Sequence, residues 1–168
     1  NETFTNLLTM FSNPVMGILV GTLFTAVIQS SSASVGVLQA LSLSCVIPYS
    51  TAIPVILGQN IGTTITPIIS AISGNTESKR VALTCLYIKM IGVIVVCGIF
   101  YLLNSIIGFE FMAQRAGAFN IAVIHTLFNV FGVIWALAFF TPFLNLVGTT
   151  ITWLGLPNPM DIAHSADL

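Results

Sequence analysis

The chain has 168 residues, of which 56% are hydrophobic and only 5% charged, with a formal net charge of −1. Soluble domains carry about 25% charged residues, so this composition excludes a soluble globular domain and indicates an integral membrane protein. The charge balance leaves no basic surface for nucleic acid, and we expect no such partner. The three cysteines lie inside apolar runs, which does not indicate a disulfide framework or a metal site.

The first apolar region predicts a hairpin over residues 14–47. Asn13-Pro14 is a typical helix start, with a capping side chain followed by proline at the first helical position. Two apolar runs of about 14 residues, or roughly 21 Å as helix, are each too short to cross a hydrocarbon core of about 30 Å. They meet at Gln29-Ser30-Ser31-Ser32-Ala33-Ser34. Irregular backbone in a membrane survives only inside protein or beside a watery cavity, so we expect a re-entrant hairpin or broken helix with a site there.

A second polar segment interrupts the next apolar region and predicts a broken helix over residues 50–73. Its sequence is Gly58-Gln59-Asn60-Ile61-Gly62-Thr63-Thr64. We expect the helix to break between the two glycines, because glycine lets the backbone leave the helical conformation. Glycine and small polar residues are also common at ordinary contacts between membrane helices. Two such segments, each between half-length apolar runs, favour a binding site over mere packing.

Two full spans are predicted over residues 81–103 and 118–140, and they repeat one another at an offset of 40 residues. This offset aligns Lys89 with Asn129 and Cys85 with His125. The charged run 77–80 before the first span is typical of a solvated loop. Thr141-Pro142 should end the second span. The predicted membrane domain, residues 1–156, then closes with a short apolar piece at 143–156, and a polar linker follows at 157–168.

The two polar segments resemble a known family. Residues 25–34 and 58–64, together with Ile124-His125-Thr126-Leu127-Phe128-Asn129, are similar to segments of the type II sodium/phosphate cotransporters, above all their bacterial branch. That family builds its transporter from two inverted repeats, each with a Gln-Ser-Ser-Ser motif. This chain contains one such motif, so the resemblance implies half of an inverted-repeat transporter. The second repeat would come from the same parent chain or from an antiparallel homodimer.

The residue types at the two segments suit an anion that arrives together with sodium. Hydroxyls, amides and the N-terminus of a half-helix can bind phosphate without Lys or Arg, and the segments themselves contain no cation. The resemblance implies phosphate contacts at Gln29, Ser30, Ser31, Ser32 and Ser34. Sodium needs oxygen ligands, which Gln59, Asn60, Thr63, Thr64 and Thr66 can provide, and the resemblance implies sodium contacts over residues 60–66.

Three further polar residues are candidates for lining the cavity. Lys89 lies about a third of the way along its span, where a charge must pair, extend to the membrane surface or face a cavity. His125 and Asn129 are four residues apart and share a helix face, which fits a packed helix contact as well as a ligand. The serines of the first polar segment have no neighbouring His or Lys to act as a base, so the pattern predicts no catalytic residue and no enzyme.

The sequence therefore predicts an all-α membrane protein that combines re-entrant or broken helices with full transmembrane spans. Its expected function is sodium-dependent symport of inorganic phosphate by alternating access in a bacterial plasma membrane, with Na⁺ as the co-transported ion and no organic cofactor. Two other functions stay open. The chain could be a non-transporting scaffold or regulatory module, or it could be an uncoupled anion channel.

Overall fold

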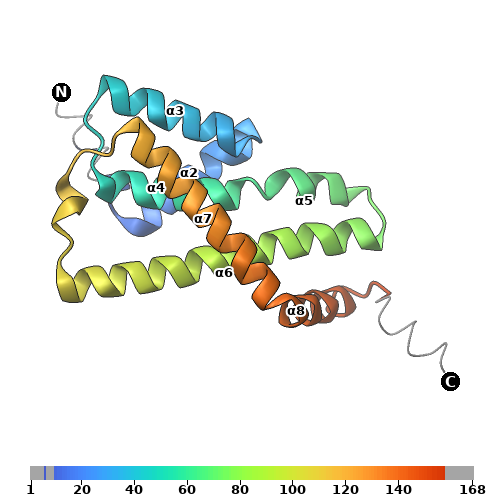
Figure 1. The fold of residues 1–168 in the computed structure, drawn as a ribbon. Coiled ribbons are helices and arrows are strands. Elements are labelled where there is room, and N and C mark those ends of the chain that lie inside the picture. Colours follow the sequence, from blue (N-terminus) through green and yellow to red (C-terminus); the bar gives the residue numbers. More distant parts are fainter. Residues whose placement is uncertain (1–5, 7–9, 158–168) are drawn as a thin grey trace.

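The computed structural model describes residue 6 and residues 10–157, and within them the chain forms helices joined by short turns (Figure 1). The helices are α2 (Pro14–Ile28), α3 (Ser31–Ser44), α4 (Tyr49–Gly62), α5 (Ile65–Ile72), α6 (Thr76–Ile107), the short 3₁₀ helix η1 (Glu110–Ala113), α7 (Ala118–Ala138) and α8 (Phe140–Trp153). Residues 158–168 of the predicted polar linker lie outside the described residues.

The helices α2 and α3 form the expected pair of half-length segments, with 15 and 14 residues. Asn13 caps α2 by accepting hydrogen bonds from the backbone N–H groups of Val15 and Met16. Ser30 caps α3 in the same way through Ala33. Between them Gln29 takes a left-handed backbone conformation, with φ 59° and ψ 19°. Gln29 and the extended Ser30 together turn the chain from one helix into the next.

Glycines bring α2 and α4 into close contact from Gly17 and Pro54 to Ala26 and Gly62. A Cβ atom on Gly17 would lie 2.7 Å from the Cβ of Pro54, and one on Gly21 would overlap the carbonyl of Val55. A Cβ on Gly58 would overlap the carbonyl of Ile18. The contacts advance together along both helices, so α2 and α4 run parallel. This is the small-residue packing by which membrane helices approach closely.

The second polar segment breaks directly after Gly62, not between the two glycines as the sequence suggested. Gly58 to Gly62 is helical within α4, and the interruption falls at Thr63 and Thr64, before α5 begins. The expectation of an unwound stretch between the glycines was wrong because those glycines serve the contact with α2 instead. A Cβ on Gly62 would overlap the carbonyl of Thr22.

The charged run at residues 77–80 is the first turn of α6, and the prediction of a loop there was wrong. The side chain of Asn75 accepts a hydrogen bond from the backbone N–H of Ser78 and so starts the helix at Thr76. Glu77 then lies at the positive end of the helix dipole and pairs with Arg80 at 3.1 Å. The helix extends beyond the predicted span at both ends, to Ile107.

The predicted second span, 118–140, ends two residues early, at Ala138, and Pro142 does not end it. Pro142 instead lies in the first turn of α8, where its missing N–H leaves no hydrogen bond unmade. The predicted short apolar piece is therefore helical and shifted three residues toward the N-terminus.

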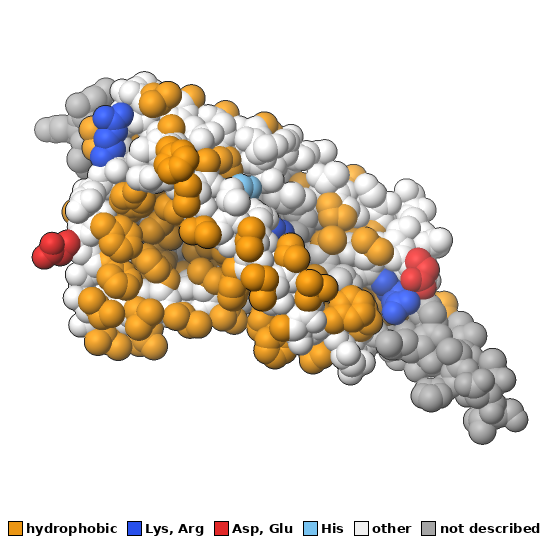
Figure 2. Space-filling view, in the orientation of Figure 1, with side chains coloured by type: hydrophobic (Ala, Val, Ile, Leu, Met, Phe, Trp, Pro, Cys, Tyr) orange, Lys and Arg blue, Asp and Glu red, His pale blue; other side chains and the backbone are white. Residues whose placement is uncertain are grey.

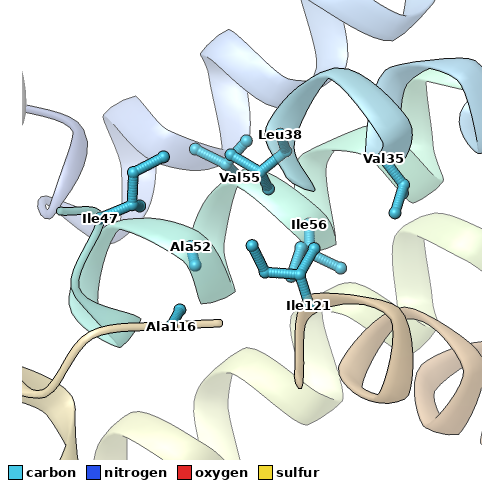
Figure 3. Packing of buried hydrophobic residues seen from close by; sticks show 8 residues of the cluster. All are labelled: Val35, Leu38, Ile47, Ala52, Val55, Ile56, Ala116 and Ile121. Atoms are coloured by element: carbon cyan, nitrogen blue, oxygen red, sulfur yellow. The ribbon is translucent and has the colours of Figure 1, made fainter. Parts of the chain in front are cut away.

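The core lies around α4, whose residues 51–60 are all buried. Figure 3 shows one cluster in which side chains of α3, α4 and α7 meet. Its members are Val35, Leu38, Ile47, Ala52, Val55, Ile56, Ala116 and Ile121. A polar segment at the end of α4 is therefore held in the middle of the molecule.

The outer surface is apolar. Figure 2 shows a face covered largely by hydrophobic side chains, with charged side chains mainly near its two ends. Large exposed side chains include Ile94, Leu102, Ile106, Val133 and Leu137. Among the described residues, three helical stretches are long and apolar enough to cross a membrane: Tyr49–Ile72, Thr76–Ile107 and Ala118–Ala138. The protein is an all-α membrane protein, as predicted.

Candidate functional site

The first polar segment lies at the turn between α2 and α3. Gln29 and Ser32 are exposed, while Ser30 and Ser31 are half-buried. The hydroxyl of Ser30 caps α3 and lies 3.3 Å from the hydroxyl of Ser32. The first backbone N–H groups of a 14-residue helix have no partner within that helix, so hydroxyl and N–H donors gather at its positive end. This end of α3 can bind an anion with neutral groups alone.

Ser34 differs from the other serines because it is fully buried. Its hydroxyl pairs with the hydroxyl of Thr25 at 2.7 Å. Thr25 was not among the predicted site residues. It precedes the polar segment by one helical turn, and only the return of α3 over α2 brings it against Ser34. We therefore assign both side chains to the framework that supports the segment rather than to its accessible surface.

Gln59 connects the two polar segments. Its side-chain N–H donates to the backbone carbonyl of Ser34 at 3.1 Å. Its side-chain oxygen Oε1 is buried and has no hydrogen-bond partner among the described residues. The sequence grouped Gln59 with Asn60, but the two side chains leave α4 in different directions, and Gln59 points toward the hairpin. An unpaired buried acceptor of this kind is available to a cation or to water.

Asn60 belongs to a second polar cluster, which joins three helices. Lys89 of α6 donates to the side-chain oxygen of Asn60 of α4 at 3.2 Å and to that of Asn129 of α7 at 2.5 Å. Asn129 in turn lies 3.2 Å from the ring Nε2 of His125. The second segment itself contains no cation, but the packing of α6 brings the ammonium of Lys89 against it from 29 residues away. Lys89 and Asn129, aligned by the 40-residue offset, are direct partners.

The threonines of the second segment lie at the break between α4 and α5. The hydroxyl of Thr63 donates to the carbonyl of Gln59 at 2.9 Å, and that of Thr64 donates to Ile61 at 2.8 Å. Thr66 is exposed on the first turn of α5. Each hydroxyl that donates to a helix carbonyl keeps its own oxygen lone pairs for another partner.

The structure thus divides the predicted site residues into three neighbouring groups. The first group offers accessible hydrogen-bond donors and consists of Gln29, Ser30, Ser31 and Ser32. The buried contacts of Ser34 with Thr25 and Gln59 hold this group in place. Asn60, Lys89, His125 and Asn129 form a hydrogen-bonded cluster on the α6 and α7 side of α4. Thr63, Thr64 and Thr66 lie at the helix break. The individual ligand roles of these residues stay predictions.

Comparison with known proteins identifies the family. A family model described as Na+/Pi-cotransporter matches residues 1–157. Protein YqeW of Bacillus subtilis is 33% identical over 129 residues, which cover 77% of this chain and 40% of YqeW. Sodium-dependent phosphate transport protein 2A of Rattus norvegicus is 44% identical over 63 residues, or 38% of this chain and 10% of that protein.

Human sodium-dependent phosphate transport protein 2B is 41% identical over 63 residues, which cover 38% of this chain and 9% of that protein. The chain therefore spans less than half the length of these relatives. No solved structure matches it significantly. The family match extends over the polar hairpin, the broken helix and the Lys89–Asn129 cluster alike. The chain belongs to the Na+/Pi-cotransporter family.

Proposed function

We propose that this chain supplies one repeat of a sodium-dependent phosphate symporter in a bacterial plasma membrane. The observation that carries the proposal is the hydrogen bond from Gln59 to the carbonyl of Ser34. It holds the Gln-Ser-Ser-Ser turn beside the end of α4, so an anion site and a set of oxygen ligands become neighbours. Coupled transport needs this arrangement, because each ion must influence the binding of the other.

Phosphate would bind at the start of α3. Gln29, Ser30, Ser31 and Ser32 offer amide and hydroxyl donors, and the helix end adds backbone N–H groups. None of these donors carries a formal charge. An anion bound in this way relies on accompanying cations for charge balance, and it leaves more readily than it would leave a permanent arginine clamp.

Sodium would bind at the end of α4 and the break after it. The oxygen ligands there are the unpaired Oε1 of Gln59 and the hydroxyls of Thr63, Thr64 and Thr66, with Asn60 beside them. Oxygen is the ligand that hard cations prefer, and half-helix ends with free carbonyls hold Na⁺ in other transporters.

The remaining half of the site would come from a second repeat of the parent chain or from an antiparallel homodimer. One Gln-Ser-Ser-Ser turn leaves Gln29 and Ser32 exposed, and exposed polar groups in hydrocarbon cost several kcal/mol each. A second, inverted turn would enclose the bound phosphate from the other side. Rearrangement of the two repeats would then open the site alternately to each face of the membrane.

The test is Ser31→Ala in the complete protein. Loss of one hydroxyl donor to a bound anion should weaken phosphate binding by about 10- to 150-fold. The matched control is Ser105→Ala, because Ser105 lies on α6 and donates only to its own helix. Unchanged phosphate affinity in Ser31→Ala, at normal expression, would refute the assignment.

Flux measurements separate the proposal from the two other functions. Uptake of labelled phosphate that follows an imposed sodium gradient supports symport. A scaffold or regulatory module would give no uptake, and an uncoupled channel would give a phosphate current that persists without sodium. The chain by itself, reconstituted as a monomer, should not transport; uptake by a cross-linkable dimer would favour the antiparallel homodimer over a second repeat.

A further inference from the structure

The ammonium of Lys89 lies between two carboxamide oxygens that are aimed at it. Asn60 uses its side-chain N–H to bond the carbonyl of Ile56, four residues earlier, at 3.0 Å. Asn129 uses its own to bond the carbonyl of His125, also four residues earlier, at 2.8 Å. Because both amides are fixed in this way, both oxygens face the position that Lys89 occupies. The two oxygens come from different helices, α4 and α7.

Within the part of the chain that the structure describes, this ammonium has no counter-ion. Among the described residues, no carboxylate lies against Lys89, and the ion pair that does occur joins Arg80 to Glu77 in the first turn of α6. The face of the Phe128 ring, 5.9 Å from the ammonium, adds a further contact of the kind that favours a cation. The cluster therefore has the character of a cation site built from neutral ligands.

We propose that Lys89 is a tethered cation that takes the place of one transported sodium ion. This inference rests on the proposed function, since it concerns the number of sodium ions that accompany each phosphate. Without the ammonium, the side-chain oxygens of Asn60 and Asn129 would be free to bind a sodium ion beside the proposed sodium ligands at the end of α4. Two unit charges about 4 Å apart at an effective dielectric constant of about 20 repel strongly enough to weaken sodium binding roughly a thousandfold. Lys89 and a sodium ion thus exclude one another.

A role for Lys89 as a direct phosphate ligand is less well supported. Successive residues of an α-helix are about 100° apart around the axis. Gln59 accordingly faces Ser34 and the hairpin, whereas Asn60 faces Lys89 and the α6 and α7 side. The ammonium is bonded to the side of α4 that points away from the serine donors. The ammonium therefore adds positive charge near the site without contacting the anion directly.

The experiment compares sodium and phosphate uptake in proteoliposomes that contain the complete protein. Labelled sodium and labelled phosphate are counted in the same samples, which gives the number of sodium ions per phosphate. The variants are Lys89→Met and Lys89→Gln, which remove the charge, and Lys89→Arg, which keeps it. Lys79→Met is the matched control, because it removes a charge at the start of α6, away from the site. Sodium-dependent uptake by the unchanged protein tests the proposed function separately.

The neutral variants should carry about one more sodium ion per phosphate than the unchanged protein, while Lys89→Arg and Lys79→Met keep its ratio. If uptake is sodium-dependent but the neutral variants keep the original ratio, the inference on Lys89 is wrong and the proposed function stands. If the neutral variants lose uptake, equilibrium binding of labelled sodium to the purified proteins decides. One additional bound sodium supports the tethered cation, and an unchanged number overturns it.

Discussion

The side-chain amide of Gln59 donates a hydrogen bond of 3.1 Å to the backbone carbonyl of Ser34, and so joins two polar segments that lie 25 residues apart. Both partners are buried. The bond fixes the start of α3, where the candidate phosphate donors lie, against the end of α4, where the candidate sodium ligands lie. Disturbing it should therefore affect binding as well as stability.

Gln59→Leu removes this bond and the unpaired oxygen beside it. We expect the free energy of unfolding to fall by about 0.5–1.5 kcal/mol, and phosphate affinity to fall by up to about tenfold because the turn loses its anchor. Gln39→Leu is the control, since the amide of Gln39 donates a comparable bond, 2.8 Å long, to Ala118. Equal phosphate affinity in the two variants, measured by uptake kinetics, would contradict the prediction.

Gln29→Gly should raise the stability of the protein but lower its affinity for phosphate. Gln29 has φ 59°, a conformation that costs a residue with a side chain roughly 1–2 kcal/mol and glycine almost nothing. We expect the glycine variant to gain about 0.5–1 kcal/mol in free energy of unfolding and to bind phosphate more weakly, because the carboxamide is gone. Gln29→Ala should lose the same affinity without the gain in stability. Thermal unfolding in detergent compares them, and equal stability of the two variants would refute the strain argument.

Gly58→Ala should destabilise the pair of helices α2 and α4. The added methyl group would overlap the carbonyl of Ile18, and overpacking of this kind costs about 1–3 kcal/mol. Gly36→Ala on α3 is the control, because apart from the backbone of its own helix no atom of the described residues lies within 4 Å of the position that its Cβ would take. That variant should be as stable as the unchanged protein or slightly more so. Similar melting temperatures for the two alanine variants would show that the close contact is not formed.

Substitutions of Thr63 distinguish an oxygen ligand from a packing residue. Its hydroxyl donates to Gln59 and keeps its lone pairs free at the helix break. Thr63→Ala should therefore raise the sodium concentration needed for half-maximal uptake more than it changes the dependence on phosphate. Thr63→Ser keeps the oxygen and should be milder. If both variants behave alike, the methyl group rather than the oxygen is what matters at this position.

The local features of the fold could be predicted because their causes are local. The lengths of the apolar runs and the Asn13 cap depend on neighbouring residues, and the structure has them where the sequence indicated. The function of the glycines could not be predicted in the same way. Glycine is favoured both where a helix unwinds and where two helices touch, and only the position of α2 shows which applies to Gly58.

The contacts of the candidate site depend on helices that are distant in sequence. Ser34 and Asn60 were chosen for their residue types, but their partners Thr25 and Lys89 depend on how α3 and α6 pack. The 40-residue offset did contain a signal, since it aligned Lys89 with Asn129. No local pattern, however, indicates that a lysine on one span will reach an asparagine at the end of another helix.

The glycine contacts between α2 and α4 also limit how the protein can move. Where backbone touches backbone, rotation of either helix about its axis would drive a carbonyl into its neighbour, and side chains cannot flex to relieve the clash. The bond from Thr22 to the carbonyl of Gly58, 3.1 Å long, fixes the pair further. We therefore expect α2 and α4 to move as one rigid unit that carries both polar segments. Opening or closing of the site would then involve movement of other helices against the α2–α4 pair, with no change between α2 and α4 themselves.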